Sequence, residues 1–114
     1  MSNIEYPADV IRELASIRAQ SEQGITYLAD AETKLVHLEL AAERAEALAL
    51  LEAQGTVPER QAVSKLASQK EREAAMLARI EINRVKTKLK HLTDAQMAVQ
   101  TAGRMIELEY KTTR

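Results

Sequence analysis

The sequence contains no cysteine, tryptophan or phenylalanine, and it has only three tyrosines, three glycines and two prolines. The absence of cysteine excludes disulfides, thiolate zinc sites and cysteine nucleophiles. A β-sandwich or barrel needs many turn residues and aromatic side chains, so their scarcity argues against both folds. No apolar run approaches the ~18 residues of a membrane-spanning helix. The first residues include Glu5 and Asp9 and no apolar run, so we expect no signal peptide and a cytoplasmic protein.

The chain is rich in residues that favour long helices. Hydrophobic residues make up 46% of it, chiefly Ala, Leu, Ile, Val and Met, and charged residues make up 29%. The net charge of −1 hides an asymmetry. Residues 1–57 carry four basic and ten acidic side chains, a net −6, whereas residues 58–114 carry twelve and seven, a net +5. The two halves can attract each other, or the basic half can bind an acidic partner.

One strong break divides the sequence, at residues 54–58. Gly55 suits the position after a helix, Thr56 and Glu59 have the spacing of a capping box, and Pro58 is tolerated in a first turn. We predict one helical hairpin domain over residues 1–114, with a helix over about 7–53, a turn at 54–57 and a helix over about 58–111. In this antiparallel hairpin, residue i lies opposite about residue 113 − i.

Each predicted helix carries an apolar seam whose spacings alternate between four and three residues, which is typical of a coiled coil. The first seam comprises Val10, Leu14, Ile17, Ser21, Gly24, Leu28, Ala31, Leu35, Leu38, Ala42, Ala45 and Ala49. The second comprises Ala78, Ile82, Val85, Leu89, Leu92, Gln96, Val99, Gly103, Ile106 and Tyr110. Gly24 leaves open whether the first helix is one piece or breaks into 7–23 and 25–53. Val63, Ala67, Ala74 and Leu77 follow a slightly different phase, which predicts a stutter near residues 74–80.

These patterns predict an all-α, coiled-coil-like fold of two long antiparallel helices. A hairpin of this kind has a thin core, so we expect a homo-oligomeric helical bundle. We assign its interface to the larger seam residues Leu28, Leu35, Leu38, Ile82, Val85, Leu89, Leu92, Val99 and Ile106. A second apolar stripe is available to meet another chain: Ile11, Ile25, Leu40, Leu48, Leu51, Leu66, Met76, Ile80, Met97, Met105 and Leu108.

No motif indicates an enzyme, and we assign no catalytic residue, metal ligand or cofactor. Neither His37 nor His91 follows a glutamate three residues upstream, as a di-iron bundle requires. Glu39, Glu43 and Glu46 share one helical face. We interpret this row as a solvated face or as a set of ion-pair partners for the neighbouring helix.

The clearest chemical signal is a basic run in the second helix. Its members are Arg79, Arg84, Lys86, Lys88, Lys90 and His91, with Glu81 as the one acidic residue between 79 and 91. Lysine and arginine side chains in such a run can neutralise phosphates and release counterions from nucleic acid. The hairpin register places few acidic residues opposite residues 84–90, so the first helix neutralises the run only in part. No aromatic residue, which would stack on single-stranded bases, lies beside it in the sequence.

The stretch from Glu81 to Gln96, together with the Ala/Glu-rich first helix, resembles small helical proteins of tailed bacteriophages. Some of these are recombination mediator-like, which are oligomeric helpers that load a recombinase or annealing protein on single-stranded DNA. The resemblance implies nucleic acid as a partner, sequence-independent binding and action in the host cytoplasm. The alternative is a coiled-coil protein-interaction module, such as a scaffold, an assembly chaperone or a small inhibitor of a host protein.

Overall fold

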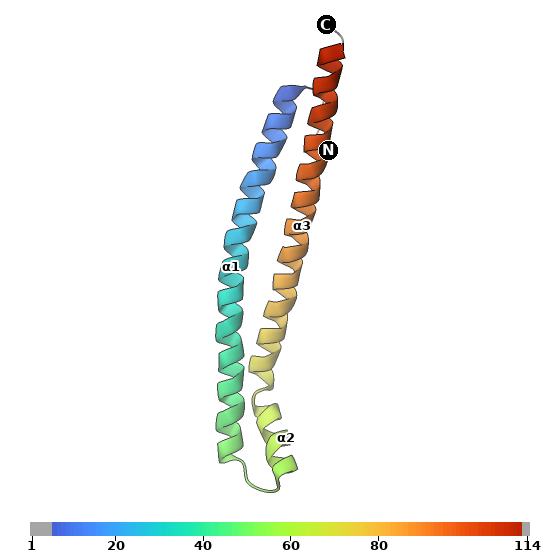
Figure 1. The fold of residues 1–114 in the computed structure, drawn as a ribbon. Helices are drawn as coiled ribbons and strands as arrows, with labels where there is room; N and C mark the ends of the chain where they lie inside the picture. Colours follow the sequence, from blue (N-terminus) through green and yellow to red (C-terminus); the bar gives the residue numbers. More distant parts are fainter. Residues whose placement is uncertain (1–5, 113–114) are drawn as a thin grey trace. The chain divides into compact units, whose positions relative to one another are not determined.

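A computed structural model describes residues 6–112 of the chain. This part is all-α and consists of three helices, α1 (Pro7–Glu52), α2 (Val57–Ala67) and α3 (Gln69–Thr112), with no strand in the described range (Figure 1). The predicted fold class is therefore confirmed. The hairpin turn and the outer ends of the helices fall within one residue of the prediction. None of the described helices combines the length and the hydropathy needed to cross a membrane.

The chain divides into two compact units. Unit 1 comprises Met1–Tyr27 and Val85–Arg114, and unit 2 comprises Leu28–Arg84. Helices α1 and α3 contribute a segment to each unit, and α2 belongs to unit 2. In unit 1, Gly24 adjoins Leu89 and Val10 adjoins Gly103. Both pairs match the predicted antiparallel register, in which the two residue numbers add to about 113.

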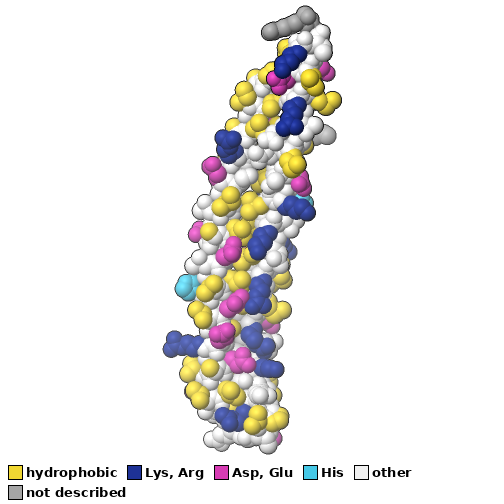
Figure 2. Space-filling view, in the orientation of Figure 1, with side chains coloured by type: hydrophobic (Ala, Val, Ile, Leu, Met, Phe, Trp, Pro, Cys, Tyr) yellow, Lys and Arg dark blue, Asp and Glu magenta, His cyan; other side chains and the backbone are white. Residues whose placement is uncertain are grey.

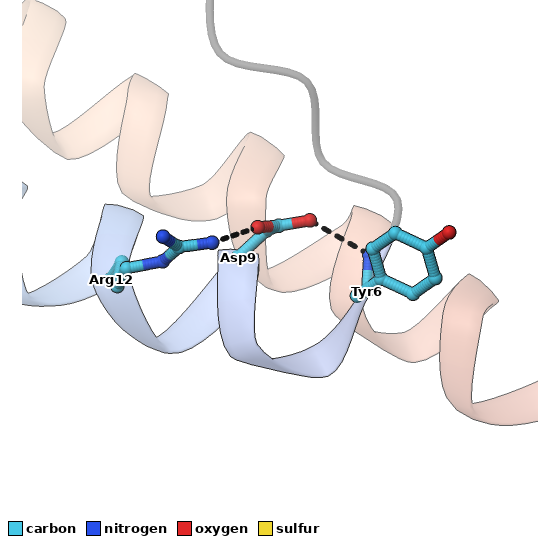
Figure 3. Close-up of polar contacts among 3 residues, drawn as sticks. All are labelled: Tyr6, Asp9 and Arg12. Carbon is cyan, nitrogen blue, oxygen red and sulfur yellow. Dashed lines mark hydrogen bonds and ion pairs between the residues drawn. The ribbon is translucent and has the colours of Figure 1, made fainter.

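Helix α1 begins with a polar cap (Figure 3). The backbone N–H of Tyr6 donates to Asp9 Oδ2 at 3.0 Å, and the N–H of Asp9 donates to the carbonyl oxygen of Tyr6 at 2.9 Å. Arg12, one turn further on, forms an ion pair with Asp9. The carboxylate thus satisfies a backbone donor that the helix leaves unpaired and lies near the positive end of the helix dipole.

Gly24 does not break the first helix, because α1 is continuous from Pro7 to Glu52. A β-carbon at Gly24 would lie 2.6 Å from Leu89 Cδ2. The absence of a side chain therefore lets Leu89 approach the backbone of α1. Of the two alternatives that the sequence left open, the structure shows the single continuous helix.

The turn between α1 and α2 has the predicted chemistry. Gly55 has φ of +114°, a conformation that side chains other than glycine rarely adopt. Thr56 and Glu59 form the capping box, with a bond in each direction between backbone and side chain. Arg60 Nη2 donates to the carbonyl oxygen of Leu50 at 3.1 Å, so α2 also closes the end of α1.

The prediction of one continuous second helix over 58–111 is wrong at Ser68, which separates α2 from α3. Ser68 has φ of −100° and ψ of 7°, and its hydroxyl donates to the carbonyl oxygens of Ser64 at 2.9 Å and Lys65 at 3.3 Å. A serine that bonds back to the preceding turn competes with regular helix geometry and bends it. Thr26 and Thr93 form the same type of bond without interrupting α1 or α3, so the hydroxyl bond accompanies the interruption and does not by itself explain it.

The two predicted seams lie where the helices are shielded from solvent, except for Tyr110, which is exposed near the end of α3. The predicted stutter near residues 74–80 is wrong. The four–three spacing continues in the same phase towards the turn through Ala75, Glu71, Ser68 and Ser64, and Leu77 is 67% exposed. The sequence concealed this part of the seam because serine and glutamate occupy core positions there.

The buried core residues are few, and those of unit 2 are mostly small. The buried hydrophobic residues are Ile17, Val99 and Ile106 in unit 1 and Ala42, Ala75 and Ile82 in unit 2. Only Ser64 and Ser68 have fully buried side chains among the described residues. Because buried apolar area is the main favourable term in folding, a seam of alanine and serine contributes little stability to unit 2.

Candidate functional site

All six residues of the predicted nucleic-acid site lie on α3, and all are exposed. Arg79 and Arg84 belong to unit 2, and Lys86, Lys88, Lys90 and His91 belong to unit 1. Among residues 6–112, no carboxylate forms an ion pair with Arg84, Lys86, Lys88 or Lys90. These four positive charges are therefore available to an external anion.

The contact of Leu89 with Gly24 fixes which part of α1 lies opposite the unit 1 members of the run. Residues 23–28 of α1 contain no acidic side chain, and Glu22 is the nearest one towards the N-terminus. The register therefore explains why α1 neutralises the positive charge of this part of the run only weakly. Leu89 packs inward, whereas its neighbours Lys88 and Lys90 are exposed.

The sequence suggested that a neighbouring subunit could bring Tyr27 close to the run, but Tyr27 lies at the level of the run within the same chain. It lies three residues after Gly24 on α1, so the antiparallel register places it at the level of Lys86 in the same unit. Its side chain is 52% exposed. The rule that pairs residue i with 113 − i contained this signal, because it assigns residue 27 to residue 86.

Arg79 differs from the rest of the run because α1 provides its partner. Its Nη2 and Nε donate to Glu39 Oε1 at 3.0 and 3.2 Å. The register placed Arg79 beside Lys34, so the contact lies further along α1 than predicted. The interpretation of the glutamate row as ion-pair partners for the neighbouring helix is confirmed for Glu39.

The Glu39–Arg79 pair belongs to a larger charged surface in unit 2. A shallow hollow of about 290 Å³ is lined there by Glu39, Ala42, Glu43, Glu46, Arg72, Ala75, Met76 and Arg79. In Figure 2, acidic side chains on α1 lie next to basic side chains on α3. Arg72 is also held by the backbone, since its Nη2 donates to the carbonyl oxygen of Lys65 at 2.6 Å. The surface thus combines three acidic with two basic side chains, of which Glu39 and Arg79 form an ion pair.

The nine residues assigned to an oligomer interface lie on the seam within the single chain. Ile82, Val99 and Ile106 are buried there, and the other six are half-buried. The residues of the second apolar stripe are among the large hydrophobic side chains that the described part of the chain leaves exposed. All eleven of its predicted members, from Ile11 to Leu108, are exposed large hydrophobic side chains. The stripe is therefore the more exposed of the two apolar surfaces.

The described residues contain no group of three or more histidine, aspartate or glutamate side chains that could hold a metal ion. An apolar groove of about 580 Å³ lies in unit 1, with Val10, Leu14, Gly103 and Ile106 among its lining residues. Arg104 and Glu107 are its charged lining residues, and they carry opposite signs. This groove offers an apolar surface for contact but no cluster of side chains that could carry out a reaction.

The comparisons with known proteins give no further assignment: no family model, no curated protein and no solved structure matches the sequence.

Proposed function

We propose that this chain binds nucleic acid through its basic run on α3, with Arg84, Lys86, Lys88 and Lys90 contacting phosphates and His91 at the margin. The observation that carries the proposal is the state of these four charges: they are exposed, and no carboxylate in residues 6–112 pairs with them. Arg79 contributes less because Glu39 already binds its guanidinium group.

The arrangement of the run favours recognition of the backbone over recognition of bases. Along α3, Lys86 and Lys90 are four residues apart on one flank, whereas Lys88 and His91 are three apart on another. Charges on separate flanks can meet phosphates on both sides of the helix. Phosphate contacts position a protein but carry no sequence information, so binding is expected to be independent of sequence.

Fluorescence anisotropy with a labelled oligonucleotide tests the proposal. Four phosphate contacts predict that a rise in salt from ~50 to ~200 mM weakens binding by about 50- to 150-fold, because released counterions oppose association at higher salt. Both single-stranded and duplex probes are measured. Absence of binding to either probe at the lower salt concentration would refute the proposal.

A triple variant locates the site. Lys86→Gln, Lys88→Gln and Lys90→Gln together remove three of the four contacts, and we expect weak binding with a much shallower salt dependence. The matched control replaces Lys70, Arg104 and Lys111 by glutamine, which removes the same charge from other positions on α3. Equal losses in the two triple variants would show general attraction to a basic chain and contradict the assigned site.

The resemblance of residues 81–96 to phage helical proteins extends the proposal to a role as a recombination accessory in the host cytoplasm. Such a helper would bring a recombinase or annealing protein onto single-stranded DNA. The readout is the rate at which a purified annealing protein pairs complementary strands, with and without this chain. A rate that does not change, under conditions where the chain binds the DNA, would reject the accessory role and leave nucleic-acid binding intact.

A second candidate function is a protein-interaction module. The observation that favours it is the exposure of Met97, Met105 and Leu108 on α3 in unit 1. Flexible methionine side chains adapt to varied apolar partners. Recovery of one stoichiometric protein partner without nucleic acid would favour this function, and loss of that partner in the variant Met97→Glu, Met105→Glu would locate it.

A further inference from the structure

Within residues 6–112, Arg79 is the only lysine or arginine of the basic run that has an ion-pair partner. Its Nη2 and Nε both donate to Glu39 Oε1, at 3.0 and 3.2 Å. The pair is accessible to solvent, because the side chain of Arg79 is 57% exposed and that of Glu39 is 40% exposed. Solvent screens such a pair, so it contributes little to the stability of the fold. We therefore consider its effect on what the guanidinium group can bind.

A carboxylate occupies an arginine in the same way as a phosphate does. Both anions accept charge-assisted hydrogen bonds from the N–H groups of a guanidinium. A phosphate that approached Arg79 would lie beside the carboxylate of Glu39, and two negative charges so close together repel each other. A phosphate that displaced the carboxylate would instead leave Glu39 without its partner. In both cases Glu39 reduces the free energy that a phosphate contact at Arg79 can gain.

Arg79 is otherwise well placed to contact nucleic acid, because a free cation lies near it on α3. Arg84 belongs to the same unit, is exposed and has no ion-pair partner among the described residues. It follows Arg79 by five residues, which corresponds to a rise of about 7.5 Å and a rotation of about 140°. One strand of DNA supplies a phosphate for about every 3.4 Å of its axis. A strand that crosses the exposed face of α3 at Arg84 therefore has phosphates at the level of Arg79.

We propose that Glu39 is an internal competitor of phosphate for Arg79 and thereby sets one end of the nucleic-acid site. The Glu39–Arg79 pair is then an autoinhibitory contact, since the chain has a fifth cation for phosphate but keeps it occupied. Glu43 and Glu46 line the same hollow and add negative charge beyond this end of the site. The inference rests on the proposed nucleic-acid function, because it concerns what limits the same site.

The variant Glu39→Gln tests the proposal. Glutamine keeps the size of the side chain and an oxygen that can accept from Arg79, but it removes the charge. Anisotropy is measured with the same labelled single-stranded and duplex oligonucleotides. With a fifth phosphate contact, a rise in salt from ~50 to ~200 mM should weaken binding by about 130- to 500-fold, compared with about 50- to 150-fold for the wild-type chain. At ~50 mM salt, the variant should bind about eight- to fifteenfold more tightly than the wild-type chain.

Glu43→Gln is the matched control. It removes the same charge from the same hollow, one helical turn further along α1, and Glu43 has no ion-pair partner among residues 6–112. We expect the salt dependence of the wild-type chain and a change in affinity of about twofold or less, since salt screens an exposed charge. A double variant, Glu39→Gln with Arg79→Gln, should lose the gain of Glu39→Gln and bind as the wild-type chain does.

The outcomes separate this inference from the proposed function. If the wild-type chain binds, three results would each overturn the inference and leave the nucleic-acid function intact: no gain in Glu39→Gln, an equal gain in Glu43→Gln, or a gain that persists in the double variant. Absence of binding by both the wild-type chain and Glu39→Gln at ~50 mM salt would overturn both. Binding by Glu39→Gln alone would support the competition and refute nucleic-acid binding by the wild-type chain.

Discussion

Leu89 of α3 packs against Gly24 of α1 so closely that a β-carbon on the glycine would lie 2.6 Å from Leu89 Cδ2. Glycine at position 24 leaves the space that the end of the Leu89 side chain occupies in unit 1. The same contact sets the register that places the exposed Lys88 and Lys90 opposite a part of α1 without acidic residues. A packing detail of the seam thereby determines the electrostatics of the surface.

The effect of Gly24→Ala on stability should depend on the residue at position 89. In the wild-type chain, the new β-carbon forces the end of the Leu89 side chain to move, and the cost of this shift, about 1 kcal/mol, offsets the ~1 kcal/mol gained in helix propensity. In a Leu89→Ala background the clash is absent, so Gly24→Ala should stabilise the chain by about 1 kcal/mol. Urea unfolding of the four proteins gives the coupling free energy, and additive effects would contradict the close contact.

The interruption at Ser68 gives a second prediction. Ser68→Ala removes the hydroxyl that donates to Ser64 and Lys65, while the backbone bond from Ser68 N–H to Ser64 O at 3.1 Å can remain. We expect α2 and α3 to join as one helix with a stability gain of about 0.5 kcal/mol, since alanine has the better helix propensity. Ser68→Leu should cost about 2 kcal/mol, because the site is fully buried and has no space for a larger side chain.

Hydrogen exchange at residues 66–70 measures the effect on the interruption, and urea unfolding measures the effect on stability. Protection that rises in Ser68→Ala supports the role of the hydroxyl. Unchanged protection would mean that the packing of α1 against this segment, rather than the serine, imposes the bend.

The sequence predicted the elements whose signals are local or periodic. The capping box of Thr56 and Glu59, the glycine turn and the four–three seam all depend on residue type and spacing, and the structure contains each of them. Ser68 was missed because a side chain that bonds to the preceding turn leaves no mark on the apolar pattern. Glu71 was missed because glutamate is normally a surface residue, so the apolar pattern does not identify its position as part of the seam.

The candidate site was predictable only in part. Exposure of the basic run follows from its positions off the seam, which the heptad pattern gives directly. The pairing of Arg79 with Glu39 was not predictable from the same register, because a long guanidinium side chain can reach along the partner helix by more than a turn. The position of Tyr27 at the level of Lys86 becomes apparent only from the antiparallel register, because the two residues are far apart in the sequence.

Glu71 provides a third prediction. Its Oε2 is buried and lacks a hydrogen-bond partner among the described residues, and the residue occupies the seam of α3. Burying an unsatisfied polar group costs free energy, whereas leucine at a seam position adds apolar contact. Glu71→Leu should therefore raise stability by about 1–2 kcal/mol. The exposed Glu73→Leu is the control, with a change within about 0.5 kcal/mol; a gain of equal size there would show a general effect of hydrophobicity on a helical chain.

Tyr27 gives a fourth prediction, which depends on the proposed nucleic-acid function. An exposed ring at the level of Lys86 can stack on an unpaired base while the lysines hold the phosphates. Tyr27→Ala should weaken binding to single-stranded DNA by about tenfold, within the range for one base stacked on an aromatic ring. Binding to duplex DNA should change little, because its bases are already stacked on one another.

The matched control is Tyr110→Ala, since Tyr110 is 47% exposed in the same unit but lies near the end of α3, away from the basic run. Tyr27→Phe should bind single strands as the wild-type chain does, because it keeps the ring. Anisotropy titrations at one fixed salt concentration separate the cases. Equal losses for Tyr27→Ala on single strands and duplex would mean that the residue supports the fold of unit 1, and equal losses for Tyr110→Ala would remove the link between Tyr27 and the basic run.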